Sequence, residues 1–553
     1  MIEDVHPLKL IRDIKRQSNS WAVLSLLFFI VLALPVFSMG VHFFSEPNEN
    51  WYHIKEYLLN NYINNTLVLI FFTGLFSVLI GLSLAWFISV YDFPLRRFFK
   101  WALILPLAIP PYIGAYTYNG MLNYTGIIQT TLRNSFGIEV NQKYFDIMTM
   151  QGAIFIFTIF LYPYVYIITR AFLENQSSAL IENARLLGSG SFEIFFRIIL
   201  PLSRTAIVGG VSLVILEVLN DYGVVKFFGI QTFSTAIFQA WFGMADIDSA
   251  IKLAGILMSI VLLLLVLEKV LRGRKNYSYS TSKVKPIKPA RLSKWKGWLM
   301  FSYVMLVFSV GFLIPFLQLV EWLFMTYDLI ISEQFLVLIW NSVFVAFVAA
   351  AFITVIAVII ANFSRMHEGI VPKLLSKTTL IGYSIPGAVI ALGVLTLFLE
   401  LDKVQKYFYG LMNQQPSVIL SLSIAMLIFA YIIRFLAIGY NSVEAGFDKV
   451  GRSFTEASRM LGMNMTQSFF KVDFKMVKGA VFGGFILVFV EVLKELPLTL
   501  ILQPFNFYTL ATKAFQYAGD EMVHEAALAS ILIILISGVS IYVFHSILEK
   551  ETN

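Results

Sequence analysis

Cysteine does not occur in the 553 residues of this chain, and charged residues make up only 14% of it. Without cysteine there is no disulfide framework, no thiolate zinc or iron–sulfur site and no cysteine nucleophile. A soluble surface needs roughly a quarter of charged residues, so the low charge content excludes a set of soluble domains. Hydrophobic residues make up 58% of the chain, which predicts an all-α polytopic membrane protein.

Long uncharged runs hold most of the apolar residues. A helix of about 20 such residues spans a bilayer core of roughly 30 Å. Such runs cover residues 21–44, 66–90, 101–118, 147–169, 298–320, 335–363, 378–399, 417–433 and 526–547. A shorter run covers residues 253–267. Two further apolar segments, 205–225 and 479–502, carry charges inside them. We therefore predict about twelve transmembrane helices.

Lysine and arginine are distributed unevenly among the connecting segments. With a cytoplasmic N-terminus, the segments on the inside hold 32 of the 41 Lys and Arg residues. Positively charged connections are retained in the cytoplasm, so this asymmetry predicts that both termini are cytoplasmic. The first run is too long for a signal-peptide core, and it reads as an uncleaved helix. We expect a multi-pass protein of a bacterial inner membrane.

A basic segment at 272–296 connects the sixth and seventh predicted helices. It contains nine basic residues and no acidic one. We interpret it as a cytoplasmic linker held near anionic lipid headgroups, with nucleic-acid binding as the weaker alternative. Because this linker accounts for the net charge of +7, we expect contact with membrane lipid and no nucleic-acid partner.

The two parts of the chain on either side of this linker repeat one another. The matched pairs, at shifts of 276 and then 274 residues, are Ile109-Pro110 with Ile385-Pro386, Gly209-Gly210 with Gly483-Gly484, and Glu217-Val218-Leu219 with Glu491-Val492-Leu493. We predict two halves of six helices, 1–271 and 297–553. Six is an even number, so both halves cross the membrane in the same direction, as a parallel repeat.

One repeated stretch lies after the fourth and tenth predicted helices. Residues 182–201 read ENARLLGSGSFEIFFRIILP, and residues 456–475 read EASRMLGMNMTQSFFKVDFK. A carboxylate that leads a short helix is stabilised by the helix dipole. The glycines Gly188 and Gly462 can take the left-handed conformation that ends such a helix. Each stretch thus predicts a compact knob that fills a groove on a soluble partner.

These stretches resemble the EAA loops of ABC importer permeases. The positions that match the family pattern are Glu182, Ala184 and Gly188 in the first copy and Glu456, Ala457 and Gly462 in the second. The second copy departs from the pattern downstream, at Val472, Phe474 and Lys475. The resemblance implies a type I importer fold in which loops at about 178–201 and 452–475 couple the chain to two ABC ATPase subunits. It also implies a periplasmic substrate-binding protein.

The chain has no nucleotide-binding motif of its own. No Gly-x-x-x-x-Gly-Lys-Ser/Thr segment occurs in it, so we expect that ATP and Mg²⁺ bind to the partner ATPase and that this chain binds no cofactor. We expect no catalytic residue, because the chain is read as a transport subunit and not as an enzyme. The six histidines show no metal-ligand spacing, and no metal site is assigned with certainty.

Charges interrupt the fifth and eleventh predicted helices, which are repeat partners. The charged residues are Glu217 and Asp221 in the first half, and Glu491, Lys494 and Glu495 in the second. A spacing of four places each pair of carboxylates on one helix face, where they are candidates to line a translocation pathway for a hard cation. The alternative is that Glu491 pairs with Lys494, while Asp221 and Glu495 lie at the outer mouth.

A second resemblance concerns the cargo. Residues 105–116, 217–243 and 491–518 are similar to those of ferric-iron importer permeases, which fuse two six-helix halves into one chain. The resemblance implies ferric iron as cargo. Thiamine, a polyamine or a phosphonate, carried by the same machine, is the alternative. An ion-coupled secondary transporter that uses the four carboxylates is a less favoured alternative of a different class.

Overall fold

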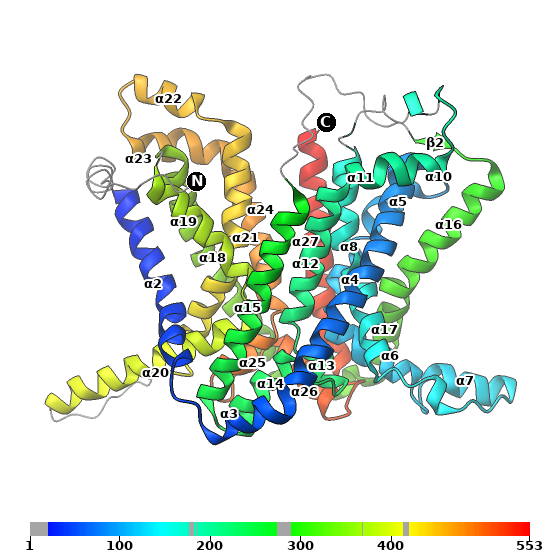
Figure 1. Ribbon diagram of the computed structural model, residues 1–553, viewed down its shortest axis with the longest axis horizontal. Helices are drawn as coiled ribbons and strands as arrows, with labels where there is room; N and C mark the ends of the chain where they lie inside the picture. The colour runs from blue at the N-terminus through cyan, green and yellow to red at the C-terminus, as the bar shows by residue number, and fades with distance from the viewer. Residues whose placement is uncertain are drawn as a thin grey trace. The chain divides into compact units, whose positions relative to one another are not determined.

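The computed structural model describes residues 20–552, apart from residues 175, 177–181, 185, 274–288, 368 and 413–419. Helices make up most of the described chain (Figure 1). A two-residue parallel ladder pairs β1 (Tyr91–Asp92) with β2 (Ala290–Arg291). The all-α prediction is confirmed. Most of the predicted basic linker lies outside the described residues.

Within the described residues, nine helices or continuous helical runs are long and apolar enough to cross a membrane. They are α2 (Ser20–Phe43), α3–η1–α4 (Glu49–Val90), α8 (Met150–Glu174), α15 (Ile247–Arg272), α16–η6–α17 (Lys294–Ile330), α18 (Glu333–Met366), α21 (Ile424–Val450), α23–η8–α24 (Met465–Leu493) and α27 (Ala526–Thr552). Each overlaps a predicted span, although α21 and α24 are displaced along the chain from the predicted runs 417–433 and 479–502.

Three more candidate spans in the described chain are pairs of helices with a sharp bend between them. The pairs are α5–η2 (Arg96–Ala108) with α6–α7 (Pro111–Phe136), α10–α11 (Phe192–Leu202) with α12 (Arg204–Asn220), and α19–η7 (Ile370–Ser384) with α20 (Gly387–Leu411). Their bends are 89°, 70° and 111°. The predicted number of twelve spans is reached when each pair counts as one.

Proline explains two of these bends. Pro110 and Pro386, which are repeat partners, precede α6 and α20 with φ, ψ of −54°, 138° and −57°, 141°. Proline lacks a backbone N–H, and it disfavours a helical conformation in the residue before it. The matched backbone angles show that the sequence repeat is also a structural repeat.

The shorter elements complete the chain between these spans. They are η3 (Gln142–Tyr144), α13 (Gly223–Phe227), α14 (Phe233–Phe238), η5 (Gln239–Gly243), α22 (Ser453–Met460), α25 (Pro497–Leu502) and α26 (Leu510–Gly519).

The chain divides into two compact units that do not follow the order of the repeats. Unit 1 contains α2, the start of α15 and the elements from α18 to α25; unit 2 contains the elements from α3 to η5, the rest of α15, and α16, α17 and α27. In unit 1, α2 packs against α18 and α20 (Figure 1). The Trp21 indole N–H donates to Thr466 Oγ1 over 3.2 Å, and Ser38 Oγ lies 3.2 Å from Thr396 Oγ1.

Each unit is built around three helices that pack closely together. In unit 2 these are α4, α8 and α12, and in unit 1 they are α18, α21 and α24. The two sets occupy equivalent positions in the sequence repeat. Each unit therefore forms its core from the same three helices of its half.

Repeated glycines allow this close approach. A Cβ added at Gly210 in α12 would lie 2.7 Å from Val165 Cα in α8. At the equivalent Gly484 in α24, an added Cβ would lie 2.9 Å from Ser442 Cβ in α21. Small residues bring helix backbones together in membranes, where packing drives association. The Gly209-Gly210 repeat is thus a packing signal.

We expect Gly210→Ala to destabilise the chain by about 1–3 kcal/mol, because the new methyl group meets a backbone atom that has no room to move. The thermal unfolding midpoint of the detergent-solubilised chain measures the effect. Gly538→Ala in α27 is the control, since nothing lies within 4 Å of a Cβ at that position. An unchanged midpoint for Gly210→Ala would contradict the packing argument.

Candidate functional site

The first loop forms a helical turn that ends at a glycine. Residues 182–184 are helical, and the backbone N–H of Ser189 donates to the Ala184 carbonyl oxygen over 3.0 Å. Gly188 has a φ of +87°, in the left-handed region. This combination is a helix C-terminal cap in which glycine avoids the steric cost of a Cβ. The chain then turns into α10 (Ser191–Ile194) and the π-helical turn η4 (Phe195–Ile199).

The second loop repeats this geometry. Helix α22 ends with the N–H of Met463 donating to the Ser458 carbonyl oxygen over 3.2 Å, and Gly462 has a φ of +85°. The π-helical turn η8 (Phe469–Asp473) leads into α24. Both glycine predictions are confirmed, and the two loops share one backbone design.

The matched acidic and small residues occupy different environments. Glu182 and Glu456 are exposed near the start of each knob. Ala184 is buried, and so is Ser458, its repeat partner, whereas Ala457 is exposed. In each knob the buried residue is therefore the third of the Glu-Ala-Ala motif, which is Ala184 in the first copy and Ser458 in the second. The match at Ala457 marks an outward-facing residue.

A buried polar network holds the second loop in unit 1. Arg365, at the end of α18, pairs with Asp473 at 3.3 Å and donates to Thr455 Oγ1 at 3.2 Å. It also donates to the Gly451 carbonyl oxygen. Thr455 in turn donates to Asp473 over 2.5 Å. Since the side chains of Arg365 and Asp473 are only 8% and 1% exposed, the pair is shielded from water.

The first loop has apolar residues where the second has this network. Ile199 occupies the position of Asp473, and Ile194 occupies that of Ser468, which hydrogen-bonds Ser458. Both isoleucines are buried. Burial of a hydrophobic side chain contributes about 1.5–3 kcal/mol without any polar partner. The two knobs thus have one backbone shape and different interiors.

Each knob carries an exposed apolar pair just before its glycine. Leu186 and Leu187 are 84% and 86% exposed, and their repeat partners Met460 and Leu461 are 88% and 82% exposed. Such exposure is costly unless a partner covers it, so each tip is a candidate interaction surface. The Glu-Ala-Ala pattern does not include these four residues. The signal that could have found them is the apolar pair before each glycine.

The candidate pathway carboxylates lie at helix breaks. Helix α12 ends at Asn220, and Asp221 Oδ1 accepts the N–H of Val224 over 2.8 Å. Helix α24 ends at Leu493, and Glu495 Oε1 accepts the N–H of Leu498 over 3.2 Å. Asp221 directly follows α12, and its N–H still donates to the Glu217 carbonyl oxygen over 3.0 Å. Glu495 lies two residues beyond α24, so the expected shared helix face is wrong for Glu491 and Glu495.

In unit 1 the charges near this break are paired. Lys494 Nζ lies 2.8 Å from Glu491 Oε1, which is the pairing that the alternative interpretation expected. Arg434 Nε lies 3.9 Å from Glu495 Oε2, and both side chains are buried. Arg434 also donates to the Ile385 carbonyl oxygen at the bend before α20. It therefore connects two helix breaks of this unit.

Glu217, the partner of Glu491 in the repeat, is partly buried near the end of α12. Among the described residues, no group of three or more His, Asp or Glu side chains is arranged to hold a metal ion. The structure assigns local stabilising contacts to Asp221, Glu491 and Glu495. A role for the four carboxylates in transport stays a proposal.

Comparison with known families explains the repeated loops. Residues 77–268 and 353–553 match the family described as binding-protein-dependent transport system inner membrane component. The match occurs twice and covers most of the chain. The chain belongs to this family. It is a multi-pass permease subunit of the ABC importer class and not an enzyme, and permeases of this class generally work with an ATPase and a binding protein.

The names of individual relatives refer to different cargoes. This chain is 23% identical to the Fe(3+)-transport system permease protein FbpB 2 of Haemophilus influenzae, over 87% of this chain and 88% of the relative. It is 21% identical to the ferric transport system permease protein FbpB of Actinobacillus pleuropneumoniae, over 78% of this chain and 62% of the relative. A molybdenum transport system permease protein, ModB of Escherichia coli, is 30% identical over 27% of this chain and 62% of its own.

We expect Gly188→Ala to loosen the first knob of the permease, because a left-handed conformation costs a residue with a Cβ about 1–2 kcal/mol. Amide hydrogen exchange of residues 186–194 should become faster. Gly190→Ala is the matched control: Gly190 lies two residues away and has open space around its Cβ position, and its φ is outside the left-handed region. Equal exchange in both variants would contradict the assigned cap.

Asp473→Ala should release the second knob, because it leaves the buried Arg365 without its carboxylate partner. Loss of one member of a buried ion pair costs about 3–5 kcal/mol. Amide exchange of α22 should accelerate while the first knob is unchanged. In the control Glu193→Ala, the lost pair lies on the surface, because Arg197 is 78% exposed. Exposed pairs contribute about 0–1 kcal/mol, so little change is expected there.

Proposed function

We propose that this chain is the permease of an ATP-driven importer that carries ferric iron from a periplasmic binding protein into the cytoplasm. Two ABC ATPase subunits bind ATP with Mg²⁺, and one docks on each loop. The permease lies in the bacterial inner membrane with both termini in the cytoplasm. The observation that carries this proposal is the repeated knob with its exposed apolar tip.

Each knob has the parts that a mechanical connection requires. The glycine cap gives it a defined end, and the tip pairs Leu186-Leu187 and Met460-Leu461 offer apolar surface to a groove. Glu182 and Glu456 place one negative charge beside each tip. Closure of the ATPase pair on ATP moves the knobs, and each knob moves the helix that follows it, α12 or α24. Hydrolysis reverses the movement.

The helices that follow the knobs end at the candidate pathway carboxylates. Movement of α12 or α24 therefore displaces Glu217 and Asp221, or Glu491 and Glu495, together with the breaks behind them. Asp221 and Glu495 hold these breaks through backbone amides. Glu217 and Glu491 are only partly buried, and they are the two at which we propose that the cargo meets the pathway.

Ferric iron is supported by the length of the similarity to a permease whose name carries Fe(3+). The FbpB 2 relative aligns over 87% of this chain, whereas ModB aligns over 27%. The machine is common to several cargoes, so molybdate, thiamine, a polyamine or a phosphonate is the alternative. Selection by the binding protein can decide among them, because it captures the cargo first.

Uptake of radiolabelled iron tests the cargo. Cells that express this chain with its cognate ATPase and binding protein should accumulate iron, and an excess of molybdate, thiamine, putrescine or phosphonate should not compete. Uptake of one of these competitors in place of iron would keep the importer and replace the cargo.

The double variant Glu182→Arg/Glu456→Arg tests the coupling. It should lose ATPase assembly and at least about 90% of uptake, because reversed charges at both docking knobs oppose a complementary surface. Glu139→Arg is the control, since Glu139 is exposed and lies outside both loops. Uptake that survives in the double variant and depends on a proton or sodium gradient would instead indicate an ion-coupled secondary transporter.

A further inference from the structure

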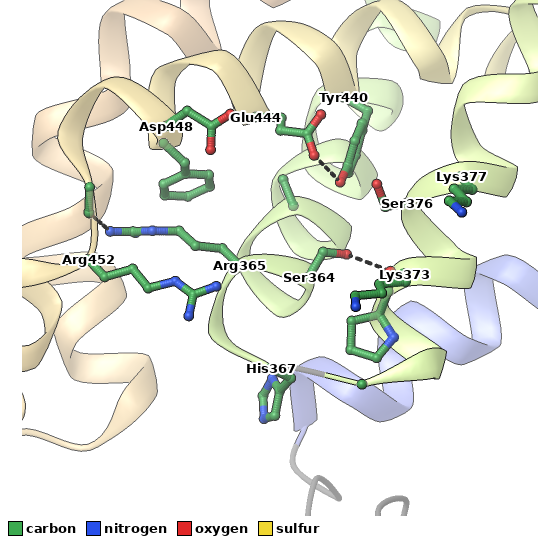
Figure 2. A pocket seen from close by; sticks show the side chains of 15 residues that line it. Ser364, Arg365, His367, Lys373, Ser376, Lys377, Tyr440, Glu444, Asp448 and Arg452 are labelled. Atoms are coloured by element: carbon green, nitrogen blue, oxygen red, sulfur yellow. Dashed lines mark hydrogen bonds between the residues drawn. The ribbon is translucent and has the colours of Figure 1, made fainter. Parts of the chain in front are cut away.

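A cleft of about 550 Å³ lies beside the second loop, within unit 1. Its walls come from the end of α18, the start of α19, the end of α21 and the segment 451–452 that leads into α22 (Figure 2). Arg365 and Gly451, which belong to the buried network of the second loop, both line this cleft. The cleft is large enough for a small polar ligand.

Basic side chains outnumber acidic ones around this cleft. The basic ones are Arg365, His367, Lys373, Lys377 and Arg452, and the acidic ones are Glu444 and Asp448 (Figure 2). Arg365 is neutralised by Asp473. Lys373 and Lys377 are exposed, one turn apart on α19, and neither has an acidic partner within 4.0 Å among the described residues. These two ammonium groups can therefore bind an anion.

The start of α19 adds to the positive potential. Gly369 is the N-cap of this twelve-residue helix, and it lines the cleft. No side chain of the described residues caps this helix. The positive end of a helix dipole combined with unsatisfied N–H groups favours phosphate. Lysines that flank such a helix start strengthen this preference.

His367 contributes hydrogen bonds more than charge. Burial lowers the pKa of His367 below its ordinary value, opposed by the Phe363 carbonyl oxygen, 3.2 Å from its Nδ1, and reinforced by the nearby Arg459 charge. The imidazole is therefore neutral at pH 7. The positive charge of the cleft depends on its lysine and arginine side chains.

The two acidic residues limit how much negative charge the cleft accepts. Glu444 accepts a hydrogen bond from the Tyr440 hydroxyl over 2.9 Å, so one of its oxygens is already used. Asp448 is exposed one turn further along α21. Both lie on the α21 wall, whereas the lysines lie on α19 (Figure 2). A small phosphate group could bind at the lysines of α19 and stay away from the acidic residues of α21.

We propose that this cleft binds a phosphate group through Lys373, Lys377 and the start of α19, with Arg452 closing the opposite side. The phosphate belongs either to the headgroup of an anionic lipid or to a soluble phosphate compound. Because Arg452 begins the second loop, a bound phosphate connects α19 to that loop and holds the knob against its unit. The regulatory consequence rests on the proposed coupling function; the binding itself does not.

The binding test uses the purified full chain in nanodiscs of neutral phosphatidylcholine, without ATPase or cargo. Radiolabelled inorganic pyrophosphate is the soluble probe, and phosphatidylglycerol added to the nanodiscs is the lipid competitor. We expect saturable pyrophosphate binding that weakens at least about tenfold in Lys373→Gln/Lys377→Gln, because the variant removes two positive charges beside the proposed anion. Asp448→Asn should strengthen binding by about threefold, because it removes a like charge.

Lys478→Gln is the matched control, because Lys478 is exposed on α24 and does not line the cleft. Its binding should equal that of the unmodified chain. Bound pyrophosphate should also slow amide exchange of α22 in the unmodified chain and not in the double lysine variant. Circular dichroism and gel filtration of each variant check that the fold is intact.

The outcomes separate the sources and decide the proposal. Competition by phosphatidylglycerol assigns the site to a lipid headgroup, and its absence assigns the site to a soluble phosphate compound. The proposal would be overturned if neither pyrophosphate nor phosphatidylglycerol binds, or if binding survives in the double lysine variant. Loss of ATPase assembly in that variant, with no anion bound by the unmodified chain, would assign the cleft to the protein partner and also overturn it. None of these results depends on iron uptake.

Discussion

Backbone amides and carbonyls inside a bilayer must find partners within the protein, and this requirement decides where the spans of this permease can break. Both helices that follow the knobs end inside apolar segments. The carboxylates of Asp221 and Glu495 accept the first amides of the elements that follow. In unit 1 the buried Arg434 binds the carbonyl oxygen of Ile385 and faces Glu495, so a single guanidinium serves two breaks. The charges that interrupt the apolar segments thus stabilise the breaks on which movement of these helices would depend.

The two halves have kept one backbone design while their side-chain chemistry has diverged. Gly188 and Gly462 share a left-handed φ, and Pro110 and Pro386 share a bend. Behind the knobs, however, Ile199 replaces Asp473 and no counterpart of the Arg365 network is needed. Backbone conformation depends on a few special residues, so it is retained at matched positions. An interior needs only complementary packing or satisfied hydrogen bonds, and either solution supports the same knob.

Local sequence signals predicted much of this architecture. Span positions follow from apolar runs, the parallel repeat follows from a constant shift, and the glycine caps follow from the motif. The shared helix face of Glu491 with Glu495 was wrong, because periodicity assumes a continuous helix and α24 ends at Leu493. The matched Ala457 is exposed while Ser458 packs, since a motif does not specify which of its small residues faces inward. The exposed tip residues lie outside the Glu-Ala-Ala pattern, and only their place directly before each glycine distinguishes them from other apolar residues.

The membrane class, the number of candidate spans, the duplication and the positions of the two knobs could all be read from the amino-acid sequence. These are properties of single segments, set by hydrophobicity, residue spacing and the conformational freedom of glycine and proline. Tertiary structure alone decided that α2 packs in unit 1 with helices of the other half, and that Arg365 holds the second knob. It also brought α18, α19 and α21 together around a basic cleft. Thr455 and Asp473, two partners of Arg365, lie 90 and 108 residues away in the chain, and only folding brings such distant residues together.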